Sequence, residues 1–270
     1  MSKNSLKILD SIFSHAYSSS GMNMPKNFTW DREFDGYFKD IVITDNNITD
    51  VDLFPAQKAY GWLIESPAVG CVAYEVIKSY YLKFDKVFTF KKELLNLSEV
   101  FELLPIGGSW IEEEDAKIYS KTKPLSIIAS DKNSAPGHKL RHAIVSRFPD
   151  SLEAFGSGYK RIKSKLEGLK DYSFSIAVEN CKEDYYFTEK LIDCFSTGTI
   201  PVFWGCPSIG DFFNTDGIVQ FDALEDLDSI IPSIMSGDHK MSSEAIEDNY
   251  NRSIKYRIAD DTLWEKIHKP

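Results

Sequence analysis

The chain has 270 residues, of which 43% are hydrophobic and 27% charged, and its net charge is −10. This is a globular composition, and the length fits two domains of about 100–150 residues each. A protein whose main partner is DNA or RNA usually carries a basic surface that neutralises phosphates, so the acidic balance argues against a nucleic-acid partner. No window approaches the roughly 18 apolar residues of a membrane-spanning helix.

The spacing of the cysteines indicates the redox state of the cellular compartment. Cys71, Cys181, Cys194 and Cys206 show no C-x-x-C spacing. Free thiols in a reducing compartment are the expectation for such a chain. The opening residues, MSKNSLKILDSIFSHAYSSSG, lack the long apolar core of a signal peptide. These features predict a cytoplasmic protein without a membrane span.

Strand and helix patterns alternate in the first half of the chain. Residues 5–15 are compatible with a strand or a short helix, and residues 18–35 have the composition of a loop. Strands are predicted at 40–44, 60–65 and 86–89, and a helix over 68–81 that Ser66 and Pro67 would start. Alternating strands and helices imply a parallel sheet covered on both faces.

A polar stretch at 118–124 marks the predicted domain boundary, which divides the chain into residues 1–120 and 121–270. The second part repeats the alternation, with strands predicted at 125–130, 173–179 and 199–204, and helices at 136–148, 160–170, 188–196, 224–235 and 242–255. This is an α/β unit of the doubly wound type. Two such domains facing each other would form a cleft at the carboxyl ends of their strands, where open α/β sheets bind ligands.

Two predicted helices begin with cations, where the helix dipole disfavours them. One carries Glu189 and Lys190 directly after its predicted cap, Thr188. The other carries His138, Lys139, Arg141 and His142 in its first turns. A bound anion would remove the conflict, because helix N-termini and Arg side chains both bind phosphate. The ordinary alternatives are a capping box and a solvated basic helix face; two such starts in one domain favour a diphosphate site.

Residues 172–207 contain three short distinctive blocks: Val178-Glu179-Asn180, Tyr186-Phe187-Thr188-Glu189-Lys190, and Gly198-Thr199-Ile200-Pro201-Val202 with Gly205 and Pro207. This stretch resembles the donor-binding signature of family 10 glycosyltransferases, the α1,3/4-fucosyltransferases. Upstream, Ser130, Ala135-Pro136 and Arg141 are similar to the family segment S-N-x-N-A-P-x-R. Asp131 stands where the family usually has Asn, and more residues separate Pro136 from Arg141 than in the family.

The resemblance covers residues 125–235, with a further match at Ile64-Glu65-Ser66-Pro67. It implies two facing Rossmann-like domains of the GT-B type, here with a shortened N-terminal domain. It implies an inverting transfer of fucose from GDP-fucose to a hydroxyl group of a glycan. Family members bind the donor without a metal, so we expect neither a cofactor nor a required divalent cation.

The resemblance also assigns roles to individual residues. Lys190 and Arg141 would neutralise the diphosphate, and Glu189 would hold the ribose. The remaining predicted donor-binding residues would line the nucleotide pocket or shape its floor: Tyr186, Glu179, Asn180, Ser130 and Thr188.

Glu65 is the candidate general base. It follows a predicted strand of the N-terminal domain, so its carboxylate is expected to point into the cleft. A base must lie within hydrogen-bond reach of the acceptor hydroxyl whose proton it takes. The alternative role of Glu65 is a charge at the start of the following helix, beside Ser66.

Other patterns carry less weight. The triplets Asp50-Val51-Asp52 and Asp226-Leu227-Asp228 have the D-x-D form that binds a divalent cation in metal-dependent glycosyltransferases. An acidic chain produces such triplets by chance, and the second lies in a predicted helix. Residues 107–109, Gly-Gly-Ser, are interpreted as a plain turn.

Three alternative functions remain open from the sequence. The same fold could use a different nucleotide-sugar donor. The chain could instead be a non-catalytic protein that binds a nucleotide sugar or a glycan. A glycosyltransferase that modifies nucleic acid is the third, and the net charge of −10 argues against it.

Overall fold

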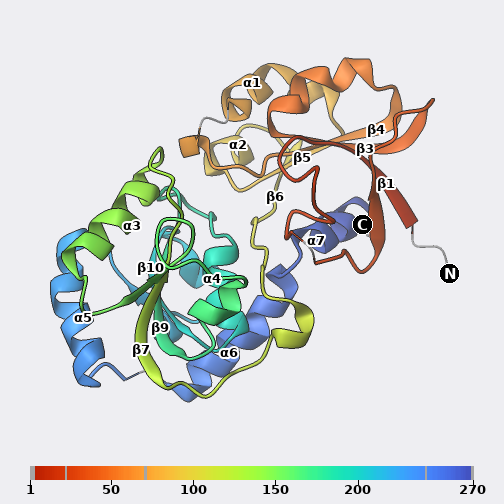
Figure 1. Cartoon of the computed structure of the whole chain (residues 1–270). Helices are drawn as coiled ribbons and strands as arrows, with labels where there is room; N and C mark the ends of the chain where they lie inside the picture. Colours follow the sequence, from red (N-terminus) through yellow and green to blue (C-terminus); the bar gives the residue numbers. More distant parts are fainter. Residues whose placement is uncertain (1–3, 22, 70–71, 241, 269–270) are drawn as a thin grey trace.

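The computed structural model describes residues 4–21, 23–69, 72–240 and 242–268. Its strands form two parallel sheets, one from each half of the chain, which are seen as two lobes in Figure 1. The predicted α/β fold class is confirmed. The proposed division at residue 120 falls between the last strand of the first sheet and the first strand of the second.

The N-terminal sheet has six parallel strands in the order β2-β1-β3-β4-β5-β6. Their bounds are β1 (Asn4–Leu9), β2 (Phe28–Asp31), β3 (Phe38–Thr44), β4 (Ala56–Trp62), β5 (Lys86–Thr89) and β6 (Phe101–Leu103), with helices α1 (Ala73–Tyr80) and α2 (Lys92–Leu95). The strand predictions at 40–44 and 86–89 are confirmed. β2 lies inside the stretch predicted as a loop, because Phe28 and Trp30 enter an aromatic core despite their polar surroundings in the sequence.

The C-terminal sheet has five parallel strands in the order β11-β10-β9-β7-β8. Their bounds are β7 (Lys123–Ile128), β8 (Glu153–Phe155), β9 (Tyr172–Val178), β10 (Ile200–Trp204) and β11 (Val219–Gln220), and the helices are α3 (Pro136–Arg147), α4 (Glu189–Ser196), α5 (Leu227–Ser236), α6 (Ser243–Ser253) and α7 (Ala259–His268). In both sheets the first strand along the chain lies between the second and the third. The order in which strands are added across the sheet therefore reverses at the first strand. This is the doubly wound topology, and such a reversal point is where these folds bind ligands.

Alternation along β9 explains how its sheet is covered on both faces. Phe174, Ile176 and Val178 pack into one hydrophobic cluster with residues of α3 and α5, while Ala177 packs into another with α4. Figure 1 shows α3 and α5 on one side of this sheet and α4 and α6 on the other. A strand buried on both faces reads as a continuous apolar run, which is why 173–179 was predictable.

Two predicted helices differ in the structure. The helix predicted over 160–170 is wrong: only a 3-10 turn, Lys165–Gly168, forms there. The side chain of Ser164 accepts a hydrogen bond from Leu166 N, and that of Glu167 accepts one from Lys163 N. The chain must then turn into β9, which begins at Tyr172. The helix predicted over 68–81 begins later, at Ala73, after a separate turn at Pro67–Val69.

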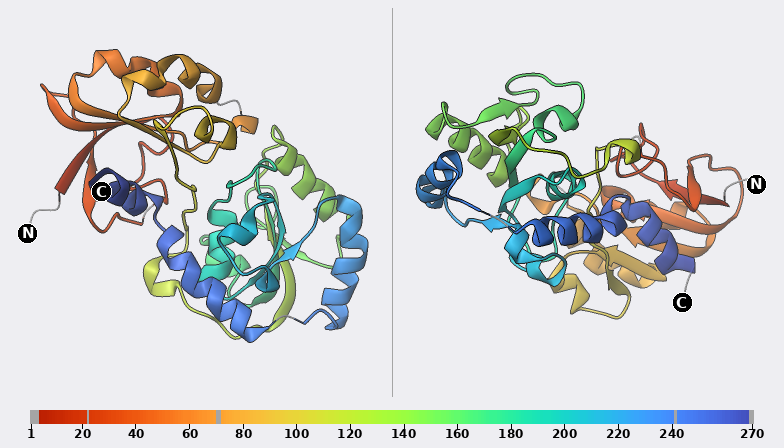
Figure 2. Two further views of the ribbon diagram at one scale, coloured as in Figure 1. Left: turned by 180° about the vertical axis from the view of Figure 1, so that it is seen from behind. Right: turned by 90° about the horizontal axis from the view of Figure 1, so that it is seen from below.

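The C-terminal helix α7 returns to the N-terminal lobe, as both views in Figure 2 show. Its Leu263 belongs to the N-terminal core, and Trp264 stacks on Phe28 at 4.9 Å between ring centroids. The buried Asp260 accepts hydrogen bonds from Trp30 Nε1 at 2.7 Å and Ser19 Oγ at 2.6 Å. By these contacts the last helix belongs with the first sheet, although the sequence placed all C-terminal helices in the second domain.

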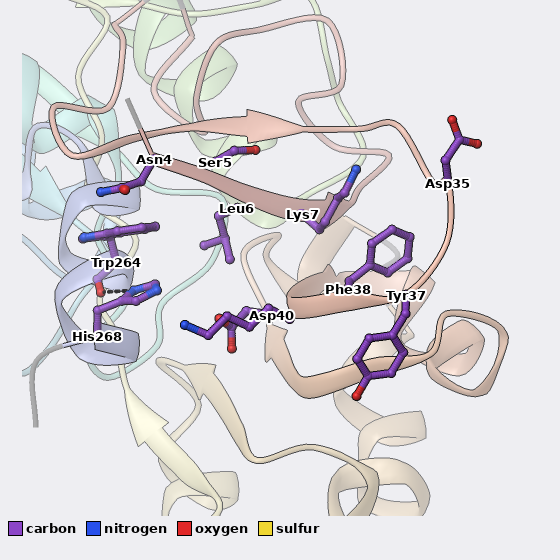
Figure 3. Close-up of a pocket in the computed structure, with 11 residues that line it drawn as sticks. Asn4, Ser5, Leu6, Lys7, Asp35, Tyr37, Phe38, Asp40, Trp264 and His268 are labelled. Carbon is purple, nitrogen blue, oxygen red and sulfur yellow. Dashed lines mark hydrogen bonds between the residues drawn. The ribbon is translucent and has the colours of Figure 1, made fainter. Parts of the chain in front are cut away.

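A hollow of about 540 Å³ lies along β1 and β3 beside α7 (Figure 3). Trp264 and His268 border it from the helix, with their rings stacked at 3.7 Å.

Of the helices in the described ranges, none combines the length and the apolar character that crossing a membrane requires.

Candidate functional site

A cavity of about 740 Å³ is lined by residues of both lobes. In the C-terminal sheet it lies where β7 and β9 end, at the reversal point of that sheet, and residues after β1 and β4 line it from the N-terminal lobe. Nearly all of the residues singled out from the sequence border this cavity: Glu65, Ser130, Arg141, Asn180, Tyr186, Thr188, Glu189 and Lys190. Glu179, which directly follows β9, is fully buried and does not border the cavity; its carboxylate is directed to the start of α4.

Glu179 connects the end of β9 to the start of α4. Its carboxylate accepts hydrogen bonds from Thr188 N and Thr188 Oγ1, both at 2.7 Å, and lies 3.3 Å from Lys190 Nζ. A Cβ atom at Gly205 would lie 2.7 Å from Glu179 Cγ, so the glycine of the G-x-P block leaves room for this side chain. Since a buried charge needs partners, this carboxylate fixes Thr188 and Lys190 in place.

Lys190 carries its ammonium to the cavity wall at the N-terminus of α4. Nζ lies 2.9 Å from Thr188 Oγ1 and 3.2 Å from Glu189 Oε1, and the side chain is 21% exposed. Burial lowers the pKa of Lys190, but the carboxylates of Glu179 and Glu189 outweigh it, and the net effect is a raised pKa. The site therefore holds a permanent cation beside the N-terminus of a helix, which is an arrangement that binds anions.

Glu189 is held by a second cation, Lys165, at 3.2 Å. Burial raises the pKa of Glu189, but Lys165 and Lys190 lower it by more, so this carboxylate remains ionised. Lys165 also lies 3.4 Å from the buried Asp193 one turn along α4, and over the Trp110 ring at 5.3 Å. Lys165 was not identified from the sequence because it was placed in a helix that does not form, and no local signal marks its partners.

Arg141 is 5% exposed and is held against the loop that follows β9. Nε donates to Val178 O at 3.1 Å and Nη2 donates to Asn180 Oδ1 at 2.9 Å. Burial lowers its pKa, with the carboxylates of Glu179 and Glu189 opposing the shift. The guanidinium is thus fixed by two acceptors and borders the cavity.

The start of α3 packs directly on the same loop, and Gly137 makes this possible. A Cβ atom at this position would lie 1.7 Å from Glu179 O, and Gly137 N donates to Asn180 O at 3.0 Å. Gly137→Ala is therefore expected to push α3 away from β9 and to lower the free energy of unfolding by about 3 kcal/mol. Urea denaturation measures this.

Gly210→Ala is the matched control, because its new Cβ would meet only Thr215 Cγ2, at 3.4 Å. We expect it to unfold at close to the wild-type urea concentration. If Gly137→Ala is as stable as Gly210→Ala, the close contact between α3 and Glu179 does not exist in solution.

Glu65 lies in the loop after β4 and borders the cavity. Asp45 Oδ1 accepts from Ile64 N at 2.9 Å and Glu65 N at 3.1 Å, and Tyr74 donates its hydroxyl to Glu65 O at 2.8 Å. These contacts fix the backbone, while Glu65 Oε1 accepts from Ser66 N at 2.8 Å. The carboxylate thus meets both descriptions given from the sequence: it borders the cleft, and it bonds the N–H of Ser66.

The loop between β9 and α4 joins the two lobes. Tyr186 belongs to the N-terminal hydrophobic core, with its ring 4.8 Å from that of Phe90, and burial raises its pKa well above the usual value. Lys91 pairs with Glu183 at 2.6 Å across the same boundary. The loop therefore closes one side of the cavity between the lobes.

Residues 107–109 have a larger role than a plain turn. Gly107 and Gly108 have φ values of 55° and 91°, which only glycine adopts readily, and both border the cavity. Gly107 N donates to Phe187 O at 3.0 Å and Gly108 N donates to Tyr256 O at 2.8 Å. The interpretation as a turn missed this crossing, for which the adjacent glycines were the available signal.

The comparison with known families agrees with the site. Residues 119–239 match the model described as glycosyltransferase family 10 (fucosyltransferase), C-terminal. This segment of the chain is similar to glycosyltransferase family 10. The resemblance read from the sequence is confirmed over this segment, which contains β7 to β11 and the starts of α3 and α4.

Individual relatives extend the picture. The chain is 32% identical over 126 residues to the alpha-(1,3)-fucosyltransferase FucT of Helicobacter pylori, covering 44% of this chain and 26% of that protein. A putative fucosyltransferase-like protein of Arabidopsis thaliana is 37% identical over 67 residues, covering 24% of this chain and 13% of that one. The matched part thus spans about a quarter or less of the length of these curated relatives.

Solved structures resemble the whole chain. A crystal structure of alpha1,3-fucosyltransferase with GDP gives a TM-score of 0.60 at 18% identity and covers 97% of this chain and 88% of that one. The OtsA apo structure gives a TM-score of 0.56 at 9% identity, covering 86% of this chain and 73% of that one. At these identities the likeness establishes the fold, two facing Rossmann-like sheets of the GT-B type.

The second D-x-D triplet lies in the family 10 segment and is occupied by protein contacts. Asp226 accepts from Asp222 N and Ala223 N, both at 2.9 Å, and Asp228 pairs with Arg147 at 2.5 Å. Within the ranges that the structure describes, no group of three or more His, Cys, Asp or Glu side chains is placed to hold a metal ion.

Proposed function

We propose that this chain is an inverting glycosyltransferase that moves fucose from GDP-fucose to a hydroxyl group of a glycan, without a divalent cation. The observation that carries the proposal is the pair of fixed cations, Lys190 and Arg141, at the carboxyl edge of the family 10 sheet. The likeness to fucosyltransferase structures determined with GDP and with GDP-fucose supports the choice of donor.

The donor half of the site would bind the nucleotide and stabilise the departing diphosphate. Negative charge builds on that group as the glycosidic bond breaks, and cations placed in advance lower the barrier. Lys190 and the N-terminus of α4 supply one positive region, and Arg141 supplies another. Glu189, held ionised beside Lys190, would accept hydrogen bonds from the ribose hydroxyls.

The acceptor half would lie on the N-terminal lobe. Glu65 would take the proton of the acceptor hydroxyl as that oxygen attacks the anomeric carbon from the face opposite the diphosphate. Attack from that face inverts the anomeric configuration. A carboxylate in this place would also favour the positive charge that develops on the sugar ring, as in glycoside hydrolysis.

Calorimetric titration with GDP, UDP and GDP-fucose, first without metal and then with Mn²⁺, tests the donor assignment. We expect metal-free binding of GDP and GDP-fucose and much weaker binding of UDP, followed by transfer of labelled fucose to an acceptor glycan. Tighter binding of UDP than of GDP would contradict GDP-fucose as the donor and indicate a donor based on UDP. A folded sample that binds none of the three nucleotides would refute the donor site.

A further inference from the structure

His138, named from the sequence only among several basic residues at the start of a predicted helix, borders the same cavity. His138 lies in the first turn of α3 and is 4% exposed. Its Nδ1 accepts a hydrogen bond from Ala135 N at 3.1 Å, and Ser134 Oγ lies 3.4 Å from the same atom. Among the residues that the structure describes, Nε2 has no hydrogen-bond partner. This nitrogen is therefore available to bind a ligand in the cavity.

The surroundings keep this imidazole neutral. Burial lowers the pKa of His138, and the neighbouring charges of Arg141, Lys132, Lys190 and His142 lower it further. The N-terminus of α3 adds a positive dipole end on the same side. Because Nδ1 already accepts the Ala135 N–H, a proton there would break that bond, and the neutral ring must carry its proton on Nε2.

The motif position is also informative. In the segment similar to S-N-x-N-A-P-x-R, Ala135-Pro136-Gly137 is followed by His138 where that pattern has Arg. Arg141 comes one helical turn later, and its Nε and Nη2 are already engaged by Val178 O and Asn180 Oδ1. The side chain at the motif's own position in this chain is therefore a neutral N–H donor.

We propose that His138 binds the diphosphate of the donor, donating its Nε2–H to a phosphate oxygen as a neutral imidazole. This inference rests on the proposed function, since it assigns a further residue to the same donor site. No proton is transferred: the Nε2–H remains on the ring, and the hydrogen bond strengthens as the departing diphosphate gains charge. Neutral histidines lowered in pKa at a helix N-terminus can act in this way.

Two substitutions separate the two nitrogens. His138→Asn keeps an acceptor near the position of Nδ1 but is too short to place a donor at the position of Nε2, whereas His138→Gln places an amide N–H at the reach of Nε2. We expect His138→Asn to weaken GDP binding by about ten- to a hundredfold, the cost of one hydrogen bond to a charged group. His138→Gln is expected to retain GDP affinity within a few-fold, and neither variant should change the affinity for guanosine, which has no phosphate.

His142→Gln is the matched control one turn along α3, because Tyr159 Oη at 2.7 Å and Lys132 O at 3.0 Å already occupy both of its nitrogens. It should bind GDP as the wild type does. Equal GDP affinity of wild type and folded His138→Asn would overturn the inference while leaving the proposed function intact. Failure of the wild type itself to bind GDP would overturn both.

A spectroscopic measurement on the wild type does not depend on how the variants fold. In protein labelled with ¹⁵N-histidine, the ¹H–¹⁵N correlations of His138 distinguish the Nε2–H tautomer from the Nδ1–H tautomer and from the imidazolium. We expect the Nε2–H pattern both without and with saturating GDP, with the Nε2 signals shifted by the nucleotide. An imidazolium or an Nδ1–H tautomer in the GDP complex, or Nε2 signals that GDP leaves unmoved, would refute the proposal.

Discussion

Glu65→Gln is expected to reduce the transfer of fucose by about 10²–10⁴-fold, the usual contribution of a general base. The amide keeps the size of the side chain, and its oxygen can still accept from Ser66 N, so the loop after β4 should keep its conformation. The donor site lies on the other lobe and should be undisturbed. Initial rates with labelled GDP-fucose, together with calorimetric titration of GDP, separate the two effects.

Glu112→Gln provides the control for this experiment. Glu112 is an exposed carboxylate that also borders the cavity, so its loss removes a similar charge from the same region. We expect it to retain near wild-type turnover. If Glu65→Gln remains active and Glu112→Gln does not, the base has been assigned to the wrong carboxylate.

Lys190→Gln is expected to weaken both the donor site and the fold. Without the ammonium, the fully buried Glu179 loses the cation that lies 3.3 Å away and keeps its two hydrogen bonds from Thr188. Removing one partner of a buried ion pair costs about 3 kcal/mol or more in the free energy of unfolding. GDP affinity should fall by about ten- to a hundredfold, because a charge-assisted bond to phosphate is also lost. Urea denaturation and calorimetry measure the two losses independently.

A double variant distinguishes these effects. Glu179→Gln together with Lys190→Gln removes both charges, so most of the stability should return while GDP binding stays weak. Lys182→Gln removes a cation that is 39% exposed and pairs with Asp222 at the surface, and it should change neither quantity appreciably. A single Lys190→Gln variant as stable as the wild type would show that Lys190 does not compensate the charge of Glu179.

Local patterns in the sequence were sufficient to predict the parts of the site that lie close together along the chain. The run ending at Glu179, the cap at Thr188 and the cations at the starts of α3 and α4 all follow from periodicity, dipole arguments and the family resemblance. β9 is buried on both faces, which makes its apolar run easy to recognise. α4 begins at the predicted cap position, although the Thr188 hydroxyl donates to Glu179 and does not cap the helix.

Features that depend on distant contacts were not predictable in the same way. Asp260 holds Ser19 and Trp30 from more than two hundred residues away, which no window of the sequence reveals. Likewise, the position of Lys165 beside Glu189 depends on the loop from 156 to 165 being irregular. His138 was seen as one of several basic residues, and only its geometry separates it from Lys139 and His142.

The return of α7 to the first lobe means that the backbone passes between the lobes twice. The two passages touch, since Gly108 in the first donates to Tyr256 O in the second. Two adjacent connections favour rotation of one lobe against the other about the line through them over twisting or sliding. The contacts Tyr186–Phe90 and Lys91–Glu183 across the same boundary oppose that rotation. Opening of the cleft about Gly108 and Tyr256 to admit a donor would therefore also require these two contacts to separate, so the β9–α4 loop ties the width of the cleft to the packing of Tyr186.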